Sequence, residues 1–401
     1  MFDSSKNNET IFLDRIIEEI ESRADFAVRA EKTIDFWKSR EPLFVKLLLT
    51  PQSLPYHAEG PTLESHISLM LKCLYAFSSG EFSLLNIEEF AREKGQEGVL
   101  VDIMHLLREE TDFFETFILC HDIAKSVLVW FDAPIDSAGH VAGFVEKITG
   151  HGTDLNLAQR LDTINRYQKL FKDFSVDHST DSSEQLSIVF YEAYNIQVHY
   201  YGHEKGIYLP VFSEFLSRVA KEKGLATKDR DLMEVIIAHH LDPLKDFLAI
   251  KPNAVKKYVS LAQVNKWSTT DILRRFQAVL LLDAVCGSKH LAPHGTWHDA
   301  SIFVHFLRSE HAFAPAWRSS REDTRKQEQT KLFRRLFREV GLDGVSLMDF
   351  FNIGPSPEFG KLLYSIQESI ILGKEIPKIR ADIDQELKKR AEAFYEKRFS
   401  A

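Results

Sequence analysis

The chain has 401 residues, of which 44% are hydrophobic and 27% charged, and its formal net charge is −9. This composition predicts a globular protein with two or three domains and excludes a general cationic coat for nucleic acid. The acidic excess lies in residues 1–300, because residues 301–401 carry 18 Lys and Arg against 15 Asp and Glu. The C-terminal quarter is therefore a local candidate for contact with a phosphate backbone.

The cysteines and the N-terminus indicate where the protein works. Cys73, Cys120 and Cys286 are widely spaced, which argues against a disulfide framework and against a structural zinc knuckle. The N-terminal MFDSSKNNETIF lacks the basic and apolar regions of a signal peptide. No apolar run approaches the roughly 18–20 residues that a membrane span needs. We expect a soluble cytoplasmic protein that does not enter a membrane.

Helical periodicity dominates the chain and predicts an all-α fold. Apolar residues spaced by three and four among charges are typical of amphipathic helices. The segments with this pattern are 11–37, which predicts one helix or a pair, 62–77, 231–241 and 271–286. The nearest approach to a strand is QVHYY at 197–201.

Pro and Gly residues mark the breaks between these helices. Residues 49–62 and 290–300 are predicted loops. Residues 132–200 are less regular and predict an insertion with some helix of its own. Beyond 300, the sequence predicts a basic helix at 321–341 and a Gly/Pro turn at 352–360.

The most unusual stretch is FFETFILCHDIAKSVLVWF, residues 113–131, which reads as a buried helix with a polar centre. His121 and Asp122 are adjacent there, and Lys125 follows three positions later. A carboxylate in such apolar surroundings costs several kcal/mol unless it is paired or bound to a cation. A His–Asp pair that satisfies its neighbours would be the ordinary explanation.

Other segments repeat this use of ligand-capable side chains. They are His66 in LESHISLML, His203 in YGHEKG, His239 and His240 after VIIA, and Asp283 in AVLLLDAVC. Imidazole and carboxylate together suit a transition metal or a Mg or Mn site with positions left for water. Adjacent helical residues point about 100° apart, so the sequence leaves open which of His239 and His240 faces the metal.

The order His, His-Asp, Asp resembles the HD-domain superfamily of metal-dependent phosphohydrolases. HAEGPTLESH (57–66), FILCHDIAK (117–125), GHEKG (202–206) and AHHL (238–241) resemble the HD domain of bacterial CCA-adding tRNA nucleotidyltransferases. The segment 344–375 resembles the tail of the same enzymes. Ala124 stands where that family usually has Gly in its HDIGK element.

Two departures from that family limit the resemblance. The roughly 55 residues before His57 contain neither the Gly-rich loop nor the Asp-x-Asp pair of the nucleotidyltransferase head, so we expect no CCA addition. The separation between Asp122 and His203 is also longer than is usual in the family. It contains three rival histidines, His140, His151 and His178. His203 is preferred because Gly202 and Glu204 match the family element.

The resemblance implies a metal centre and an active site. The implied metal ligands are His66, His121, Asp122, His203, His239, His240 and Asp283. They would hold one or two divalent ions, and Mn, Fe, Co, Ni, Zn and Mg are not distinguished. The implied catalytic residues are Asp122 and Lys125, where Lys125 steadies negative charge on the phosphoryl group. His57 and Glu59 are predicted to contact the substrate, with loop ordering as the ordinary alternative.

The predicted domains and function follow from the same resemblance. We expect an N-terminal helical segment (1–55), an HD phosphohydrolase domain (56–300) with the insertion at 132–200, and a C-terminal helical domain (301–401). The expected substrate is a nucleotide or RNA-end phosphoester, such as a 2′,3′-cyclic phosphate or a 2′- or 3′-phosphate. The alternatives are a hydrolase of small nucleotides, including cyclic or dinucleotide signals, and a non-catalytic RNA-binding or regulatory protein.

A basic cluster in the C-terminal domain is the candidate for contact with RNA. It comprises Lys331, Arg334 and Arg335. The functional interpretation of this cluster is a groove that binds an RNA backbone, and the structural alternative is a solvated helix face.

Overall fold

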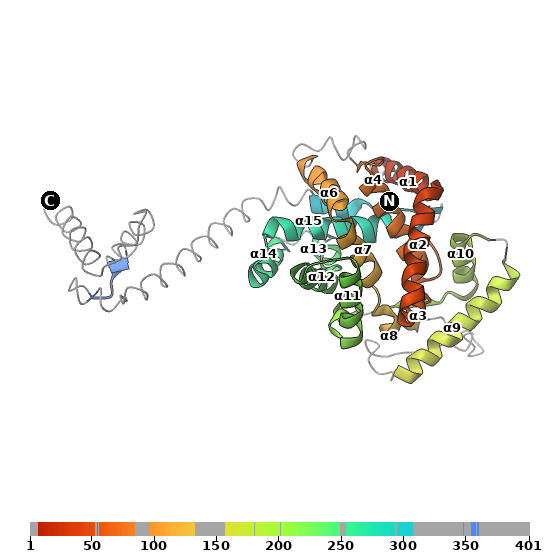
Figure 1. The fold of residues 1–401 in the computed structure, drawn as a ribbon. Helices are drawn as coiled ribbons and strands as arrows, with labels where there is room; N and C mark the ends of the chain where they lie inside the picture. The colour runs from red at the N-terminus through yellow and green to blue at the C-terminus, as the bar shows by residue number, and fades with distance from the viewer. Residues whose placement is uncertain are drawn as a thin grey trace. The chain divides into compact units, whose positions relative to one another are not determined.

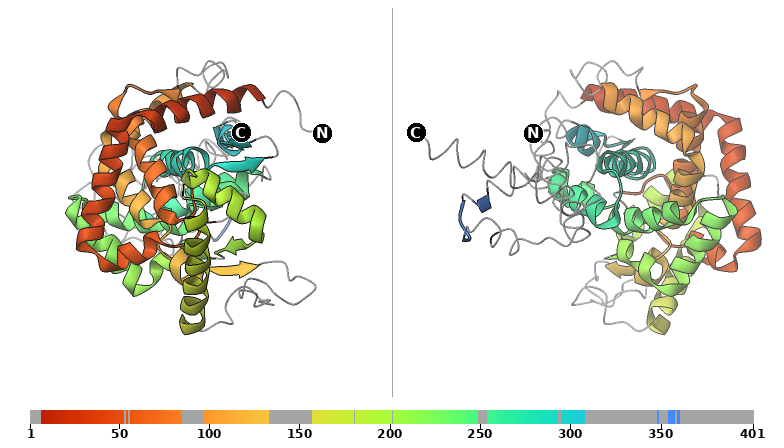
Figure 2. Two further views of the ribbon diagram at one scale, coloured as in Figure 1. Left: turned by 90° about the vertical axis from the view of Figure 1, so that its right-hand side faces the viewer. Right: turned by 60° about the vertical axis from the view of Figure 1, so that its left-hand side comes forward.

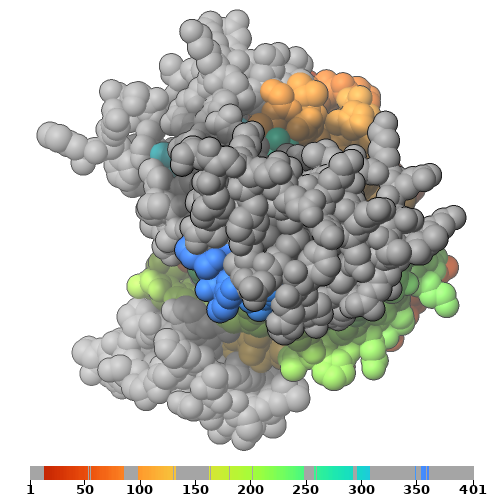
Figure 3. All heavy atoms as spheres, turned by 90° about the vertical axis from the view of Figure 1, so that its left-hand side faces the viewer, coloured from red at the N-terminus to blue at the C-terminus, as the bar shows by residue number. Residues whose placement is uncertain are grey.

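The computed structural model describes most of the first three quarters of the chain. The described residues are 7–52, 54, 56–84, 97–132, 157–179, 181–200, 202–248, 254–292, 295–307, 348, 354–357 and 359–360. The chain divides into two compact units, 1–314 and 315–401. The few described residues of the second unit are the blue spheres in Figure 3. The predicted basic helix at 321–341 lies outside the described residues.

The first unit is built from helices, which confirms the predicted all-α fold (Figure 1). The N-terminal helices are α1 (Asn7–Ser22), α2 (Ala24–Arg40), α3 (Pro42–Leu48), α4 (Leu63–Ser79), α6 (Glu97–Glu109), α7 (Thr111–Cys120) and α8 (Lys125–Leu128). The later helices are α9 (Leu157–Asp177), α10 (Ser183–Tyr194), α11 (Pro210–Glu222), α12 (Thr227–His239), α13 (Asp242–Leu248), α14 (Ala254–Asn265) and α15 (Thr269–Leu280). The described residues also form a 3₁₀-helix, η3 (His203–Tyr208), a π-helix, η4 (Leu281–Cys286), and a helical segment at 301–307.

The described strands form two short antiparallel pairs. β1 (Trp130–Asp132) pairs with β2 (Gln197–His199), with Phe131 opposite Val198. β3 (His290–Ala292) pairs with β4 (Gly295–Trp297). The segment 197–201, which came nearest to a strand pattern in the sequence, thus contains the short strand β2, whereas the stretch 290–300 contains a hairpin in place of the predicted loop.

Several helix boundaries follow from local chemistry. The predicted segment 11–37 divides into α1 and α2 at Arg23, which has extended backbone angles. α4 ends at Gly80, whose φ of 80° lies in the left-handed region that glycine adopts without strain. Ser268 caps the N-terminus of α15, because its side chain accepts a hydrogen bond from the backbone N–H of Asp271.

The stretch 113–131 is not one continuous helix. α7 ends at Cys120, a turn covers 121–124, and α8 begins at Lys125. In the turn, the N–H of Lys125 donates to the carbonyl of Asp122, which is tighter than the α-helical pattern. The predicted buried helix therefore breaks at the polar dyad.

The insertion carries its own helices, as predicted, together with a small apolar core. α9 and α10 pack with the β1–β2 pair around Phe131, Tyr167 and Phe190. The Phe131 and Tyr167 rings stack with centroids 4.8 Å apart. Figures 1 and 2 show α9 at the lower edge of the helical bundle.

The main core surrounds α4, which is buried along most of its length. Tyr258, Phe247 and Phe306 stack on one another and are buried, so residues 301–307, which are helical, belong to the core of this unit. Among the described residues, no helix combines the length and the apolar character needed to cross a bilayer.

Candidate metal centre

Segments that are distant in sequence converge on one buried centre. Each ligand-capable side chain lies at or next to a helix end or at an irregular turn, where the backbone can aim it inward. The positions are the first turn of α4 (His66), the turn after α7 (His121 and Asp122), the start of η3 (His203), the residue after α12 (His240) and the π-helix η4 (Asp283). π-Helical turns are frequent at functional sites, because the extra residue redirects a side chain.

Two glycines allow these segments to approach closely. A Cβ on Gly206 would lie only 2.3 Å from the Cβ of Ala124. η3 can therefore pack directly on the dyad turn, and Nε2 of His203 lies 3.1 Å from Oδ1 of Asp122. A Cβ on Gly287 would lie 2.4 Å from Cγ of Met70, so η4 can approach α4 only with glycine there.

The side chains form two adjoining groups, each able to hold a metal ion. The first group is His66, His121 and Asp283, and the second is Asp122, His203 and His240. Within each group, one ligand atom from every residue lies within 4.8 Å of the others. The groups touch, since Nε2 of His121 lies 3.3 Å from Oδ2 of Asp122. The buried residues can therefore hold a metal ion, as the sequence predicted.

All four histidines in these groups are oriented in the same way. Each uses Nδ1 to donate a hydrogen bond to a main-chain carbonyl, which can only accept. The donor–acceptor pairs are His66 to Gly287 (2.9 Å), His121 to Ile118 (3.1 Å), His203 to Tyr200 (2.8 Å) and His240 to Ile237 (2.6 Å). The proton of each neutral ring is thereby held on Nδ1, and the Nε2 lone pair is left for a ligand.

Within the described part of the chain, Nε2 of His121 and Nε2 of His203 are buried without a hydrogen-bond partner. Both lie 3.1 to 3.3 Å from carboxylate oxygens of Asp122. Lone pairs on nitrogen and on carboxylate oxygen repel at this separation unless a proton or a cation lies between them. The donor set therefore fits a divalent cation, which imidazole and carboxylate ligands would share.

The neighbouring carboxylates favour the protonated form of two of these histidines, His66 and His121. Burial alone would lower the pKa of His66, but hydrogen bonds with Asp283 and Glu59 outweigh it and raise that pKa to about 10. Burial also opposes the charge on His121, but Asp122 and Asp283 raise its pKa to about 9. For His240 burial prevails and lowers the pKa to about 4.

Both carboxylates stay ionised despite burial. Desolvation would raise the pKa of Asp122, but His121 and Lys125 hold it well below its usual value. For Asp283 the opposing groups are His121 and His66, and its pKa is likewise well below the usual value. The centre therefore offers two buried, ionised carboxylates, those of Asp122 and Asp283, as ligands for a cation.

Lys125, three residues after Asp122, lies in the centre. Its Nζ is 2.6 Å from Oδ2 of Asp122, and the residue is buried. The ammonium also lies over the Tyr200 ring, 5.0 Å from its centroid. Lys125 is thus held at the pocket by a carboxylate on one side and an aromatic face on the other.

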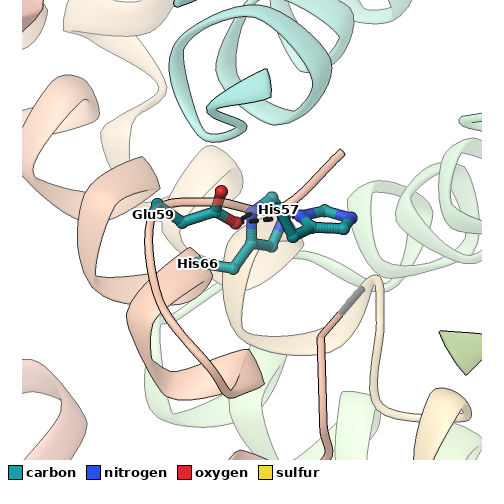
Figure 4. A group of neighbouring side chains, drawn as sticks. All are labelled: His57, Glu59 and His66. Atoms are coloured by element: carbon teal, nitrogen blue, oxygen red, sulfur yellow. Dashed lines mark hydrogen bonds and ion pairs between the residues drawn. The ribbon is translucent and has the colours of Figure 1, made fainter. Parts of the chain in front are cut away.

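Glu59 links the centre to the neighbouring His57 (Figure 4). Its Oε1 accepts from Nδ1 of His57 at 2.8 Å and from Nδ1 of His66 at 3.1 Å. Its Oε2 accepts from the backbone N–H of Lys289. The Glu59 side chain is 2% exposed and is not among the residues that line the pocket, so it orders the loop in this structure, and its substrate contact stays a prediction. His57 does line the pocket.

Several predicted or rival residues are not part of the centre. His239 is turned away from the two groups, and its Nδ1 lies 2.6 Å from Oδ2 of Asp242. Its prediction as a ligand is corrected, because its helical neighbour His240 takes the inward position. His178 stacks on Phe174 in the insertion. His140 and His151, like Lys331, Arg334 and Arg335, lie outside the described residues.

A pocket of about 440 Å³ opens onto the centre. Asp122, Lys125, His203, His240 and Asp283 all line it. Leucine, valine and isoleucine side chains supply much of the remaining wall. This size and lining are typical of small-ligand sites, in which an apolar wall surrounds a few polar groups.

The sequence missed some groups that shape the site. The carbonyl oxygens of Gly287 and Tyr200 orient two histidines, and no sequence pattern marks such a role. Tyr56 and His290 line the pocket, and only the proximity of Tyr56 to the HAEG element hinted at this. Comparisons with protein-family models, with curated proteins and with solved structures found no match.

Proposed function

We propose that the chain is a metal-dependent phosphohydrolase that acts on nucleotide or RNA-end phosphoesters. The observation that carries the proposal is the common orientation of four buried histidines, whose Nε2 atoms point toward two carboxylates at one pocket. The substrate class comes from the HD-domain resemblance of His66, His121-Asp122 and Asp283. Within this class, 2′,3′-cyclic phosphates and 2′- or 3′-phosphates are the most specific proposal.

In this proposal, each of the two groups of ligands binds one cation. His66, His121 and Asp283 would hold one ion, and Asp122 with His203 and His240 would hold a second. When bound, a divalent cation activates water and polarises a phosphoryl oxygen. The chain's own contribution is to fix the imidazoles through main-chain carbonyls and to keep both carboxylates ionised.

Lys125 and His57 act on the substrate directly in this proposal. The Lys125 ammonium lines the pocket beside Asp122 and would neutralise charge on the phosphoryl oxygens as it builds up. Nδ1 of His57 is engaged with Glu59, so its other ring nitrogen is left for a substrate oxygen. The apolar wall excludes water around these charges and strengthens their interactions.

Metal analysis and one pair of variants test the proposal. The purified chain should bind about one or two divalent ions and hydrolyse bis-p-nitrophenyl phosphate with Mn, Co, Ni or Mg added. Asp122→Ala should lower this rate at least about a hundredfold, because it removes a ligand and the partner of Lys125. Asp242→Ala removes a carboxylate outside the pocket and should keep the rate within about threefold.

Two outcomes would contradict the proposal in different ways. A chain that binds no divalent ion and shows no hydrolysis would overturn both the metal centre and the enzyme. A chain that binds the ion but hydrolyses no phosphoester would favour the non-catalytic, regulatory alternative. Equal activity of Asp122→Ala and the unmodified chain would place the chemistry at another site.

A further inference from the structure

An aromatic corner lies in the pocket wall, apart from the metal ligands. Tyr56 and His290 both line the pocket, and their rings meet at 90° with centroids 5.8 Å apart. The Trp297 ring packs against His290, with centroids 5.5 Å apart. The corner thus consists of the Tyr56 and His290 rings at a right angle, with Trp297 supporting the His290 ring.

The Tyr56 ring is open to a ligand. Tyr56 is 62% exposed, whereas the other large aromatic side chains near the centre are largely buried. An exposed aromatic surface on a pocket wall is costly in water and gains from contact with another flat, weakly polar ring. Tyr208, also exposed at 51%, does not line the pocket and so offers a comparison.

The corner is fixed relative to the metal centre. The N–H of Ala58 donates to the carbonyl of Lys289 at 2.7 Å, and the N–H of Lys289 donates to Oε2 of Glu59 at 3.0 Å. Glu59 in turn holds His66 through its other oxygen. The loop that carries Tyr56 and the strand that carries His290 are therefore joined through the carboxylate that orients a metal ligand.

We propose that Tyr56 and His290 bind the nucleobase of the substrate by stacking. The inference rests on the proposed function, and it assigns the substrate as a nucleoside phosphate unit, either free or at the end of an RNA. The phosphate would lie beside Lys125, and the base would lie against one ring of the corner with its edge toward the other. Asp299 and Ser288 also line the pocket and offer acceptors to amino or hydroxyl groups of the nucleoside.

The test compares ligands that differ only in the base. Adenosine 5′-monophosphate and ribose 5-phosphate would be titrated calorimetrically into the metal-loaded chain in the cold, with released phosphate assayed to correct for turnover. The unmodified chain should bind the nucleotide more tightly. Tyr56→Ala should reduce that preference about 5- to 100-fold, the range that loss of one base–aromatic stack produces. Tyr56→Phe keeps the ring and should retain the preference.

The controls separate stacking from general damage. Tyr208→Ala removes an exposed tyrosine outside the pocket and should leave the preference for the nucleotide unchanged. Circular dichroism of every variant would confirm folding, and His290→Ala provides a second, independent disruption of the corner. An RNA oligonucleotide with the same terminal phosphate distinguishes a free nucleotide from an RNA end as the tighter ligand.

Two results would overturn the inference. One is equal affinity of the unmodified chain for adenosine 5′-monophosphate and ribose 5-phosphate. The other is a Tyr56→Ala chain that retains the full preference. Failure of the proposed function looks different, because binding of the nucleotide through Tyr56 without hydrolysis of any phosphoester would leave stacking intact and remove the enzyme.

Discussion

His239 and His240 are neighbours in sequence, yet they belong to different regions of the molecule. His240 is buried among the metal-ligand groups, and its Nδ1 is fixed by the carbonyl of Ile237. The His239 side chain is 21% exposed, and its Nδ1 is engaged with the carboxylate of Asp242. Lys257 bonds to the same carboxylate at 2.6 Å, so this outer region is a partly buried network of paired groups.

The comparison shows that residue type alone does not identify a metal ligand. Both regions contain histidines beside carboxylates at short distances. In the outer network the Asp242 carboxylate already has a cationic partner, Lys257, and so needs no bound cation. In the inner centre a main-chain carbonyl occupies one ring nitrogen and the other nitrogen faces a buried carboxylate, which leaves a place for a cation.

Among the substitutions that compare the inner and outer regions, the largest expected effect comes from replacing the two histidines separately. His240→Ala should lower metal affinity and hydrolysis about 10- to 100-fold or more, since loss of a ligand is at least as severe as loss of a residue that orients one. His239→Ala should change both by less than about threefold. Metal content by mass spectrometry and initial rates on bis-p-nitrophenyl phosphate measure the two effects.

His240→Gln keeps the volume of the buried side chain and separates ligand loss from a cavity. If His239→Ala loses metal while His240→Ala retains it, the assignment of the inner and outer positions is reversed. Equal losses in both variants would show that the two histidines act together.

The pKa values in the inner centre predict how metal affinity depends on pH. Without metal, His66 and His121 hold protons up to about pH 10 and pH 9, and a cation must displace those protons to bind. Affinity should therefore rise at least about tenfold per pH unit as pH increases from about 6 to about 8. His240 adds nothing to this slope, because its pKa is lowered to about 4.

The sign of the effect on folding is opposite in the metal-free chain. A histidine whose pKa is raised above 6.5 stabilises the fold fully below that pH, and the contribution is lost as pH rises toward 9 or 10. Competition with a chelator measures the affinity, and thermal unfolding with and without metal measures the stability. An affinity that does not change with pH would show that the ligands are already unprotonated.

The smallest expected effect comes from replacing Gly206, the glycine that lets η3 pack on the turn of His121 and Asp122. Gly206→Ala places a methyl group against Ala124 and should destabilise the chain by about 1–3 kcal/mol. It should also lower activity, because His203 would be displaced from Asp122. Gly98→Ala lies in α6 with no atom within 4 Å of the new Cβ and should stabilise by about 0.5–1 kcal/mol.

Urea unfolding of both variants measures the difference. A Gly206→Ala chain as stable as the unmodified one would show that η3 can move away from the dyad turn at little cost. Activity retained in that variant would also weaken the role given to the contact between His203 and Asp122.

Much of the fold followed from sequence because it depends on local pattern. The helices at 62–77 and 231–241 have apolar residues spaced by three and four, and this spacing is enough to predict helices there. The stretch 113–131 was predicted as one helix because its composition is uniformly apolar, and composition does not reveal where a backbone turns. The break after Cys120 accompanies the close packing of Gly206 on Ala124, two residues 82 positions apart in the sequence.

The sequence by itself determined the all-α class, the dyad His121-Asp122 and the set of candidate ligands around it. Residue chemistry suffices for this, because imidazole and carboxylate in apolar segments need a partner. Only the tertiary structure decided that His240 rather than His239 faces inward, that Glu59 orients His66, and that Tyr56 and His290 form a corner in the pocket. These facts depend on contacts between distant segments, and such contacts leave no periodic trace in one sequence.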